Sequence, residues 1–420
     1  MRTTALRLYG KKDLRLESFE LPPIRDDEIL VKLVTDSLCM SSYKAAMKGS
    51  DHKRVPSDIA THPTVLGHEF CGEIVEVGAK WQDDWKPGMR FVIQTGMKET
   101  YDAIGYSYQY MGGDMTYGII PNFIIERGYV IPYDGDAFFY GSLVEPLSCV
   151  TGAVHGQYHT RHGEYVHIMG IKQGGNAAAL AAAGPMGLAM IDYLIHRDER
   201  PNLLVVTDID ADRLSRAAKA LPPDDAKRFG VKLIYVNTGD LPDPAARLRE
   251  LSGGEGYDDV FVFAPVPSVV EQGDAILSYD GCLNFFAGPE NEQFTAPFNF
   301  YDVHYNATHI AGTSGGNTDD MIESLALAAA GRITPAILVT HVGGLDSAAE
   351  ATLGMPKTYG GKKLIYNHIS MPLTAIADFE KLGKSDTLFA GLSDLVKKSG
   401  GLWCKEAEEY LLKNGKTLES

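Results

Sequence analysis

AAALAAAGPMGLAMIDYLIH, residues 177–196, decides the fold. A run of small apolar residues leads into a tight turn, and an apolar, helix-like segment follows at once. The turn consists of Gly184, Pro185, Met186 and Gly187. Gly184 lets a backbone approach a pyrophosphate, Gly187 lets a helix pack closely on a strand, and a helix N-terminus attracts phosphate. The stretch therefore predicts a dinucleotide-binding loop, against the alternative of an ordinary strand–helix turn.

Strand-like and helix-like segments alternate around this loop, from about residue 163 to 315. Six apolar runs predict strands: 177–182, 203–209, 232–237, 259–264, 282–288 and 308–314. Segment 210–221 between two of them has a helical pattern. Short continuous apolar runs joined by helices are typical of a parallel, doubly wound sheet. The run 165–175 also predicts a strand ending in a Gly-rich turn. We reject it as the phosphate loop because another apolar strand, not a helix, follows it.

An acidic residue stands where a cofactor ribose would be recognised. Asp208 ends the run that follows the loop, about twenty residues further on. A carboxylate there accepts hydrogen bonds from a ribose 2′-hydroxyl and repels a 2′-phosphate. The position favours NAD(H) over NADP(H).

The remaining residues predict a second, β-rich domain. Short β-like runs at 28–38, 72–78, 89–96 and 118–126 are punctuated by Gly and Pro. The last hundred residues return to mixed structure and end in an amphipathic helix at 402–414. We expect a cofactor domain at 163–315 and a catalytic domain formed by 1–162 with 316–420.

Bulk properties restrict the function. The chain has 420 residues and a formal net charge of −16, which disfavours nucleic acid and anionic membranes as partners. The N-terminus lacks the apolar core of a signal peptide, and no apolar run is long enough to span a membrane. Five scattered cysteines do not form a disulfide framework. These features predict a reduced, cytoplasmic enzyme with a small-molecule substrate.

A candidate metal site lies in the β-rich part. Cys39, the pair His68-Glu69 and a later Glu145 offer one thiolate, one imidazole and two carboxylates. This donor set suits zinc with an open coordination position, which makes the metal a Lewis acid. Taken singly, Cys39 is more simply a buried small residue and His68 a hydrogen-bonded core histidine. Their order ahead of a nucleotide-binding domain favours the metal site.

The chain resembles a known family. A Cys-x-Ser segment, Gly-His-Glu, Glu-Pro-Leu, Gly-Pro-x-Gly and a following Rossmann domain resemble the medium-chain zinc-dependent alcohol and polyol dehydrogenases. More local stretches are similar to the L-sorbose-1-phosphate reductase group, which is related to the sorbitol dehydrogenases. These stretches are DSLCMSSYKAA, HPTVLGHEFCGEIVEVG, GYSYQYMGGD, DDVFVFAPV, CLNFFAGP and HIAGTSGGNTDDMIESL.

The resemblance implies a fold, a reaction and a site. The fold is a GroES-like, mostly-β catalytic domain joined to a Rossmann domain, and the assembly is a homodimer or homotetramer. The reaction is hydride transfer between a nicotinamide cofactor and a secondary alcohol, with Ser41 receiving the alcohol proton. The implied zinc ligands are Cys39, His68, Glu69 and Glu145, with the role of Glu69 open between ligand and neighbour. The implied cofactor contacts are residues 184–187, Asp208, Arg213, Ala287, Gly288, Thr313 and Ser314.

Two departures from the family affect this site. Relatives place Asp and His three and five residues after the ligand Cys, where this chain has Ser42 and Lys44. The partner that orients His68 is therefore open, and Lys44 either ends the proton path, reaches a substrate phosphate or lies in solvent. The four cysteines of a structural zinc are also missing from the Tyr-rich stretch 95–114. We expect one catalytic zinc and no structural zinc.

Substrate identity rests on weaker signals. The stretch Asp51-His52-Lys53-Arg54 is a basic patch that predicts a phosphate clamp, against the alternative of a solvated loop. Lys44 and Lys363 are other candidates for that role. Tyr106, Tyr108 and Tyr110 alternate and share one face if extended, and Tyr108 and Tyr110 are substrate candidates. Three functions stay open: a polyol-phosphate dehydrogenase, a dehydrogenase of a free polyol or secondary alcohol, and a nucleotide-binding relative without turnover.

Overall fold

The computed structural model describes residues 1–96 and 99–419. The chain forms two compact units: Met1–Pro146 with Pro335–Ser420, and Leu147–Thr334. The first limit falls within helix α4 (Val144–His155), earlier than the predicted limit at 162, and the second falls later than 315. No helix in the described ranges is long and apolar enough to cross a membrane.

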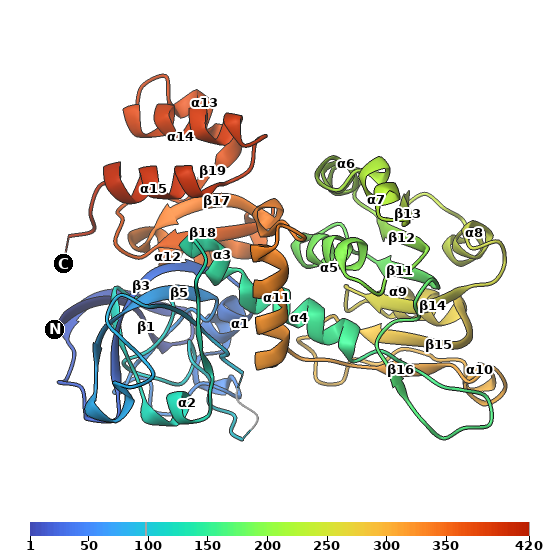
Figure 1. The fold of residues 1–420 in the computed structure, drawn as a ribbon, viewed down its shortest axis with the longest axis horizontal. Helices are drawn as coiled ribbons and strands as arrows, with labels where there is room; N and C mark the ends of the chain where they lie inside the picture. The colour runs from blue at the N-terminus through green and yellow to red at the C-terminus, as the bar shows by residue number, and fades with distance from the viewer. Residues whose placement is uncertain (97–98, 420) are drawn as a thin grey trace. The chain divides into compact units, whose positions relative to one another are not determined.

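The second unit is built on a six-stranded parallel sheet (Figure 1). Its strand order is β13-β12-β11-β14-β15-β16, with every neighbouring pair parallel. The strands are β11 (Asn176–Leu180), β12 (Leu203–Asp208), β13 (Lys232–Asn237), β14 (Tyr257–Val262), β15 (Leu277–Phe285) and β16 (His309–Ala311). All six predicted strands are present, and β11, β12 and β14 are buried along most of their length, as the apolar runs predict.

Helices connect these strands. They are α5 (Pro185–His196), α6 (Ala211–Ala220), α7 (Pro223–Arg228), α8 (Pro244–Leu251), α9 (Pro267–Ala275), α10 (Phe300–Tyr305) and α11 (Thr318–Ala329). Local sequence sets where they begin. Pro185 occupies the first turn of α5, and Asp210 caps α6 by accepting from the backbone N–H groups of Asp212 and Arg213.

Segment 165–175 differs from its prediction as a sheet strand. Only Ile168–Met169 is extended there (β10), and it pairs with β9 (Tyr158–His159) in a separate two-stranded hairpin. Its side chains are exposed, because this segment does not join the six-stranded sheet.

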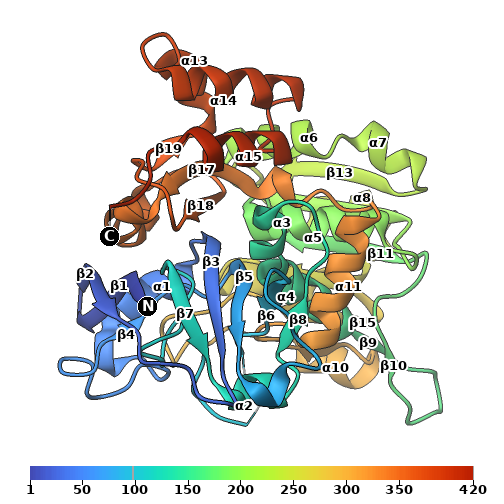
Figure 2. The same cartoon turned by 60° about the vertical axis from the view of Figure 1, so that its left-hand side comes forward.

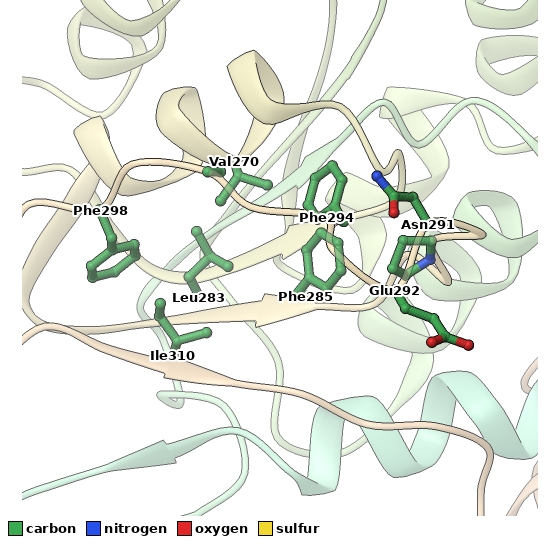
Figure 3. Close-up of a pocket in the computed structure, with 10 residues that line it drawn as sticks. Val270, Leu283, Phe285, Asn291, Glu292, Phe294, Phe298 and Ile310 are labelled. Carbon is green, nitrogen blue, oxygen red and sulfur yellow. The ribbon is translucent and has the colours of Figure 1, made fainter.

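An apolar pocket lies on β15 and α9 of this unit (Figure 3). Val270, Leu283, Phe285, Phe294, Phe298 and Ile310 line much of it. None of its lining residues belongs to the predicted cofactor loop.

The first unit is a β-rich barrel-like domain. An eight-stranded sheet has the order β19-β17-β18-β3-β5-β6-β8 with β7 paired to β3, and a smaller sheet has the order β2-β1-β4. The strands are β1 (Arg2–Gly10), β2 (Asp13–Glu20), β3 (Ile29–Ser37), β4 (Thr64–Val65), β5 (Phe70–Val77), β6 (Arg90–Ile93), β7 (Tyr117–Ile120), β8 (Val130–Pro132), β17 (Val339–Gly344), β18 (Lys362–Tyr366) and β19 (Thr374–Ala375). Strand β18 pairs antiparallel with β3, which returns the late chain to the N-terminal part.

The run 118–126 is only half strand. It forms β7 up to Ile120 and then helix α2 (Asn122–Glu126), with Pro121 at the N-cap. Pro121 lacks the N–H that a strand ladder needs and suits the start of a helix. The further helices of the unit are α1 (Met40–Lys48), α3 (Phe138–Ser142), the first residues of α4, and α12 (Ala348–Gly354).

The C-terminal tail forms three helices rather than one. These are α13 (Phe379–Leu382), α14 (Thr387–Lys398) and α15 (Lys405–Asn414), which Figure 2 shows together beside β17 and β18. Glu408 of α15 ties this lobe to α3. Its carboxylate accepts from the backbone N–H groups of Phe138 at 2.5 Å and Phe139 at 2.9 Å, and from the Tyr366 hydroxyl at 2.8 Å.

Burial gives Glu408 a testable pH signature. Burial raises its pKa to about 7, although the Tyr366 hydroxyl and two backbone donors favour the charged form. Because the folded-state pKa exceeds that of an exposed glutamate, this group stabilises the fold fully below about pH 4.5, and that stabilisation is lost as pH rises through about 7.

Urea unfolding gives the free energy of unfolding of wild type and of Glu408→Gln at each pH. We expect the value for wild type, relative to that of the variant, to fall by about 1–3 kcal/mol between pH 4.5 and 8. The exposed Glu409→Gln is the matched control and should give a flat difference. A flat difference for Glu408→Gln would contradict the raised pKa.

Candidate metal and cofactor sites

Three predicted ligands gather in the first unit. One ligand atom each from Cys39, His68 and Glu69 lies within 4.8 Å of the others. Cys39 stands at the N-cap of α1, two residues after the end of β3, and the His68-Glu69 pair directly precedes β5. The pairing of β3 with β5 brings the two segments side by side.

Gly67 explains why glycine precedes His68. Its φ is +89°, and a Cβ there would lie 2.5 Å from the Asp114 backbone nitrogen. Only glycine combines this conformation with this close approach. The turn aims the following two side chains at Cys39.

Ser42 orients the His68 ring. The Ser42 Oγ lies 3.2 Å from His68 Nδ1, and the Tyr106 hydroxyl lies 3.4 Å from Nε2. A serine thus stands where relatives are expected to use an aspartate, and it answers the question that the sequence left open. Burial lowers the pKa of His68, which favours the neutral imidazole that binds metals.

Lys362 holds the Glu69 carboxylate. Its Nζ contacts both carboxylate oxygens, at 2.6 Å for Oε2, and both side chains are buried. Burial alone would lower the pKa of Lys362, but the Glu69 carboxylate and Cys39 raise it above its usual value. Sequence reasoning missed this residue. The one available signal was a charged pair, Lys362-Lys363, opening an otherwise apolar strand.

Cys39 and Glu145 complete the donor chemistry. The pKa of the Cys39 thiol is raised to about 12, mainly by burial and secondly by the charge of the Glu69 carboxylate. Burial also raises the pKa of Glu145, whereas His68 lowers it. A cation is what these groups need to ionise together, since a bound metal deprotonates a coordinating thiol. The donor set therefore fits zinc. Cys39, His68 and Glu69 form the tight group, and Glu145 acts on them electrostatically.

Two further carboxyl groups lie behind the ligands. Asp36 Oδ1 accepts from the Glu69 backbone N–H at 3.1 Å. Burial raises the pKa of Asp36 well above its usual value and that of Asp114 to about 7. Both groups favour protonation near neutral pH, which limits the negative charge around the site.

The alternating tyrosines have different surroundings. Tyr106 is buried beside His68, and its hydroxyl is hydrogen-bonded to Ser41. Tyr108 packs against the barrel core, and Tyr110, 39% exposed, contacts Phe19. The substrate roles of Tyr108 and Tyr110 stay predictions. Two residues of the Tyr-rich stretch, Met97 and Lys98, lie outside the described residues.

The predicted cofactor residues cluster at the carboxyl ends of parallel strands in the second unit, where dinucleotides bind. Gly184 caps α5, and a Cβ on Gly187 would lie 1.8 Å from the Ala182 carbonyl oxygen. Asp208 ends β12; its carboxylate accepts from the N–H groups of Ile209 at 2.9 Å and Ala183 at 3.2 Å. The remaining predicted residues follow β12, β15 and β16: Arg213, Ala287, Gly288, Thr313 and Ser314.

Comparison with known proteins agrees with this geometry. Residues 185–330 match the zinc-binding dehydrogenase model, and residues 25–129 match the alcohol dehydrogenase GroES-like domain. The chain belongs to the zinc-binding dehydrogenase family. It is 52% identical to mannitol-1-phosphate 5-dehydrogenase of Aliivibrio fischeri, over 98% of this chain and 97% of that one. It is 48% identical to L-sorbose 1-phosphate reductase of Klebsiella pneumoniae, over 99% and 98%.

A solved structure shows the same fold. The 2R,3R-butanediol dehydrogenase of Bacillus subtilis matches with a TM-score of 0.70 and 23% identity, over 87% of this chain and 99% of that one. The predicted family and fold class, a GroES-like part with a parallel Rossmann sheet, are confirmed. The protein is a zinc-dependent dehydrogenase that uses a nicotinamide cofactor.

The buried pair of Lys362 and Glu69 gives a stability test. Removing one partner leaves the other charge buried and unpaired, which typically costs about 3–5 kcal/mol. We expect chelator-treated Lys362→Met to lose stability of this order in urea unfolding, and the double variant Glu69→Gln/Lys362→Met to recover most of it. Equal losses in the single and double variants would show that the pair is not the source.

Proposed function

We propose that this enzyme interconverts a secondary alcohol of a polyol phosphate and the corresponding ketose phosphate, of the glucitol 6-phosphate and L-sorbose 1-phosphate type. The observation that carries the reaction is the grouping of Cys39, His68 and Glu69 beside the hydroxyls of Ser41 and Tyr106. The substrate class is supported by two relatives of about half identity, a mannitol-1-phosphate 5-dehydrogenase and an L-sorbose 1-phosphate reductase.

The ligand residues have distinct tasks. Zinc, held by Cys39 and His68 with Glu69 or Glu145, would supply a Lewis acid for the substrate oxygen. Ser42 fixes the His68 ring, and Lys362 fixes the Glu69 carboxylate, so the donors are positioned before substrate binds. Such preorganisation is what a dehydrogenase contributes, since the cofactor carries the hydride.

We assign Ser41 to the proton of the substrate alcohol: its hydroxyl would accept that proton and pass its own proton outward. Its side chain is hydrogen-bonded to Tyr106, whose hydroxyl lies 3.4 Å from His68 Nε2. The Tyr106 hydroxyl thus lies between Ser41 and the His68 ring. Tyr106 orients Ser41 and does not ionise, because burial raises its pKa well above the usual value.

We propose one catalytic zinc per chain and NAD(H) as the preferred cofactor. Asp208 supports the cofactor preference, since its buried carboxylate is fixed by backbone N–H groups at the end of β12. We also propose a homo-oligomer, supported by β16, which is one of the two edge strands of the six-stranded sheet.

A substrate panel tests the proposed reaction. Zinc-loaded protein should oxidise glucitol 6-phosphate or galactitol 1-phosphate with NAD at least about tenfold more efficiently than sorbitol, since charge-assisted contacts to phosphate exceed 1 kcal/mol. Activity on unphosphorylated alcohols alone would establish a free-polyol dehydrogenase instead. Absence of activity on any alcohol after zinc addition would favour a non-catalytic nucleotide-binding protein.

Asp208→Asn tests the cofactor preference. The amide keeps an acceptor near the backbone N–H groups but loses the charge that repels a 2′-phosphate. We expect the ratio of kcat/KM for NAD over NADP to fall by about tenfold. The exposed Asp212→Asn, four residues away, should leave the ratio unchanged. An unchanged ratio in Asp208→Asn would assign the preference to other residues.

A further inference from the structure

Four cations surround one histidine close to the ligand group. Lys44 and Lys48 lie four residues apart on α1 and share one helix face. Lys53 and Arg54 belong to the loop that follows. The His52 ring is half-buried, and its pKa is lowered to about 4. Burial is the largest cause, and the charges of all four cations add to it. Such a concentration of positive charge stands out in a chain of net charge −16.

This basic cluster, defined as Lys44, Lys48, Lys53 and Arg54, is joined to the ligand group through Tyr106. The His52 ring stacks on Tyr106 with centroids 5.6 Å apart and planes at 8°. The Arg54 guanidinium carbon lies 5.6 Å from the Tyr106 ring centroid, and Arg54 acts electrostatically on His68 and Glu145. The cluster therefore begins next to the reacting centre.

The loop that carries Arg54 is held in place. Ser107 Oγ donates to the Arg54 carbonyl oxygen at 2.6 Å, and the Arg54 N–H donates to His52 Nδ1 at 3.3 Å. Val55, directly after it, is buried in an apolar cluster with Ile59 and Tyr106. These contacts favour a built binding loop over the alternative of a merely solvated one.

Three cations of the cluster take part in none of the ion pairs found in the described residues. Among the ion pairs of residues 1–96 and 99–419, none involves Lys48, Lys53 or Arg54. Two other lysines near the site have partners of their own. Lys362 is bound to Glu69, and buried Lys363 donates to the Gly361 carbonyl oxygen at 2.9 Å.

We propose that Arg54 and Lys48, assisted by Lys44 and Lys53, bind the phosphate of the substrate while its alcohol lies at the Cys39–His68–Glu69 group. Ser41, Lys44 and Lys48 share one face of α1, whose N-cap is the ligand residue Cys39. In glucitol 6-phosphate the carbon that is oxidised is bonded to the carbon that bears the phosphate, so the phosphate must lie next to the reacting centre, where the Arg54 guanidinium approaches Tyr106. The guanidinium of Arg54 suits bidentate contact with a phosphate. This inference rests on the proposed function, because it assigns the specificity of the same site.

Arg54→Gln and Lys48→Gln test the assignment in the zinc-loaded enzyme. The ratio of KM for glucitol 6-phosphate to KM for sorbitol should rise about tenfold in each variant. Arg54→Lys should recover part of the loss, because it keeps the charge without the fork. Lys80→Gln, a surface lysine of the same unit paired with Glu126, is the matched control and should leave the ratio unchanged.

Binding measurements separate the outcomes. Titration calorimetry with glucitol 6-phosphate and with inorganic phosphate should show about tenfold weaker binding in both glutamine variants and an unchanged Kd for NADH. Weaker NADH binding with an unchanged KM ratio would assign the cluster to the cofactor and overturn the inference. If wild type oxidises glucitol 6-phosphate but neither variant shifts the ratio, the inference fails and the proposed function stands. If wild type oxidises only free polyols, both the inference and the proposed function are wrong.

Discussion

The buried ion pair of Lys362 and Glu69 is the constraint on which the site depends. It joins strand β18 of the late chain to the residue directly after His68, and β18 itself pairs with β3, whose end leads into Cys39. The thiol, the imidazole and the carboxylate are therefore fixed by one set of strand pairings. Because an unpaired buried charge is costly, a fold that left either partner alone would be strongly destabilised.

Charge balance around this pair explains the chemistry. Burial opposes ionisation of Cys39, Glu145, Asp36 and Asp114, so these acidic groups would gain from a nearby cation. Lys362 already neutralises one of them. A zinc ion at the remaining groups would balance their charge and supply a Lewis acid. On its other side the site meets the basic cluster, where the charge is reversed.

Much of this could be predicted from the sequence, for physical reasons. The loop 184–187 and Asp208 signal a dinucleotide domain because tight packing and ribose recognition require particular residues at fixed spacing. Cys39, His68 and Glu69 indicate a metal site because thiolate, imidazole and carboxylate groups are the side chains that bind zinc. Lys362 could not be found this way, since it lies 293 residues from Glu69 and only strand pairing brings them together. The contact of Ser42 with His68 and the three tail helices likewise depend on tertiary packing. Helix α2 was missed because the β-like pattern of its residues conceals the effect of Pro121.

X-ray absorption at the zinc edge tests the central claim most directly. Zinc bound to the wild-type protein should show one sulfur ligand at about 2.3 Å with nitrogen and oxygen ligands at about 2.0–2.2 Å. The sulfur contribution should disappear in Cys39→Ser. A spectrum with several sulfur ligands, or a sulfur signal that survives Cys39→Ser, would contradict a catalytic zinc held by Cys39, His68 and a carboxylate.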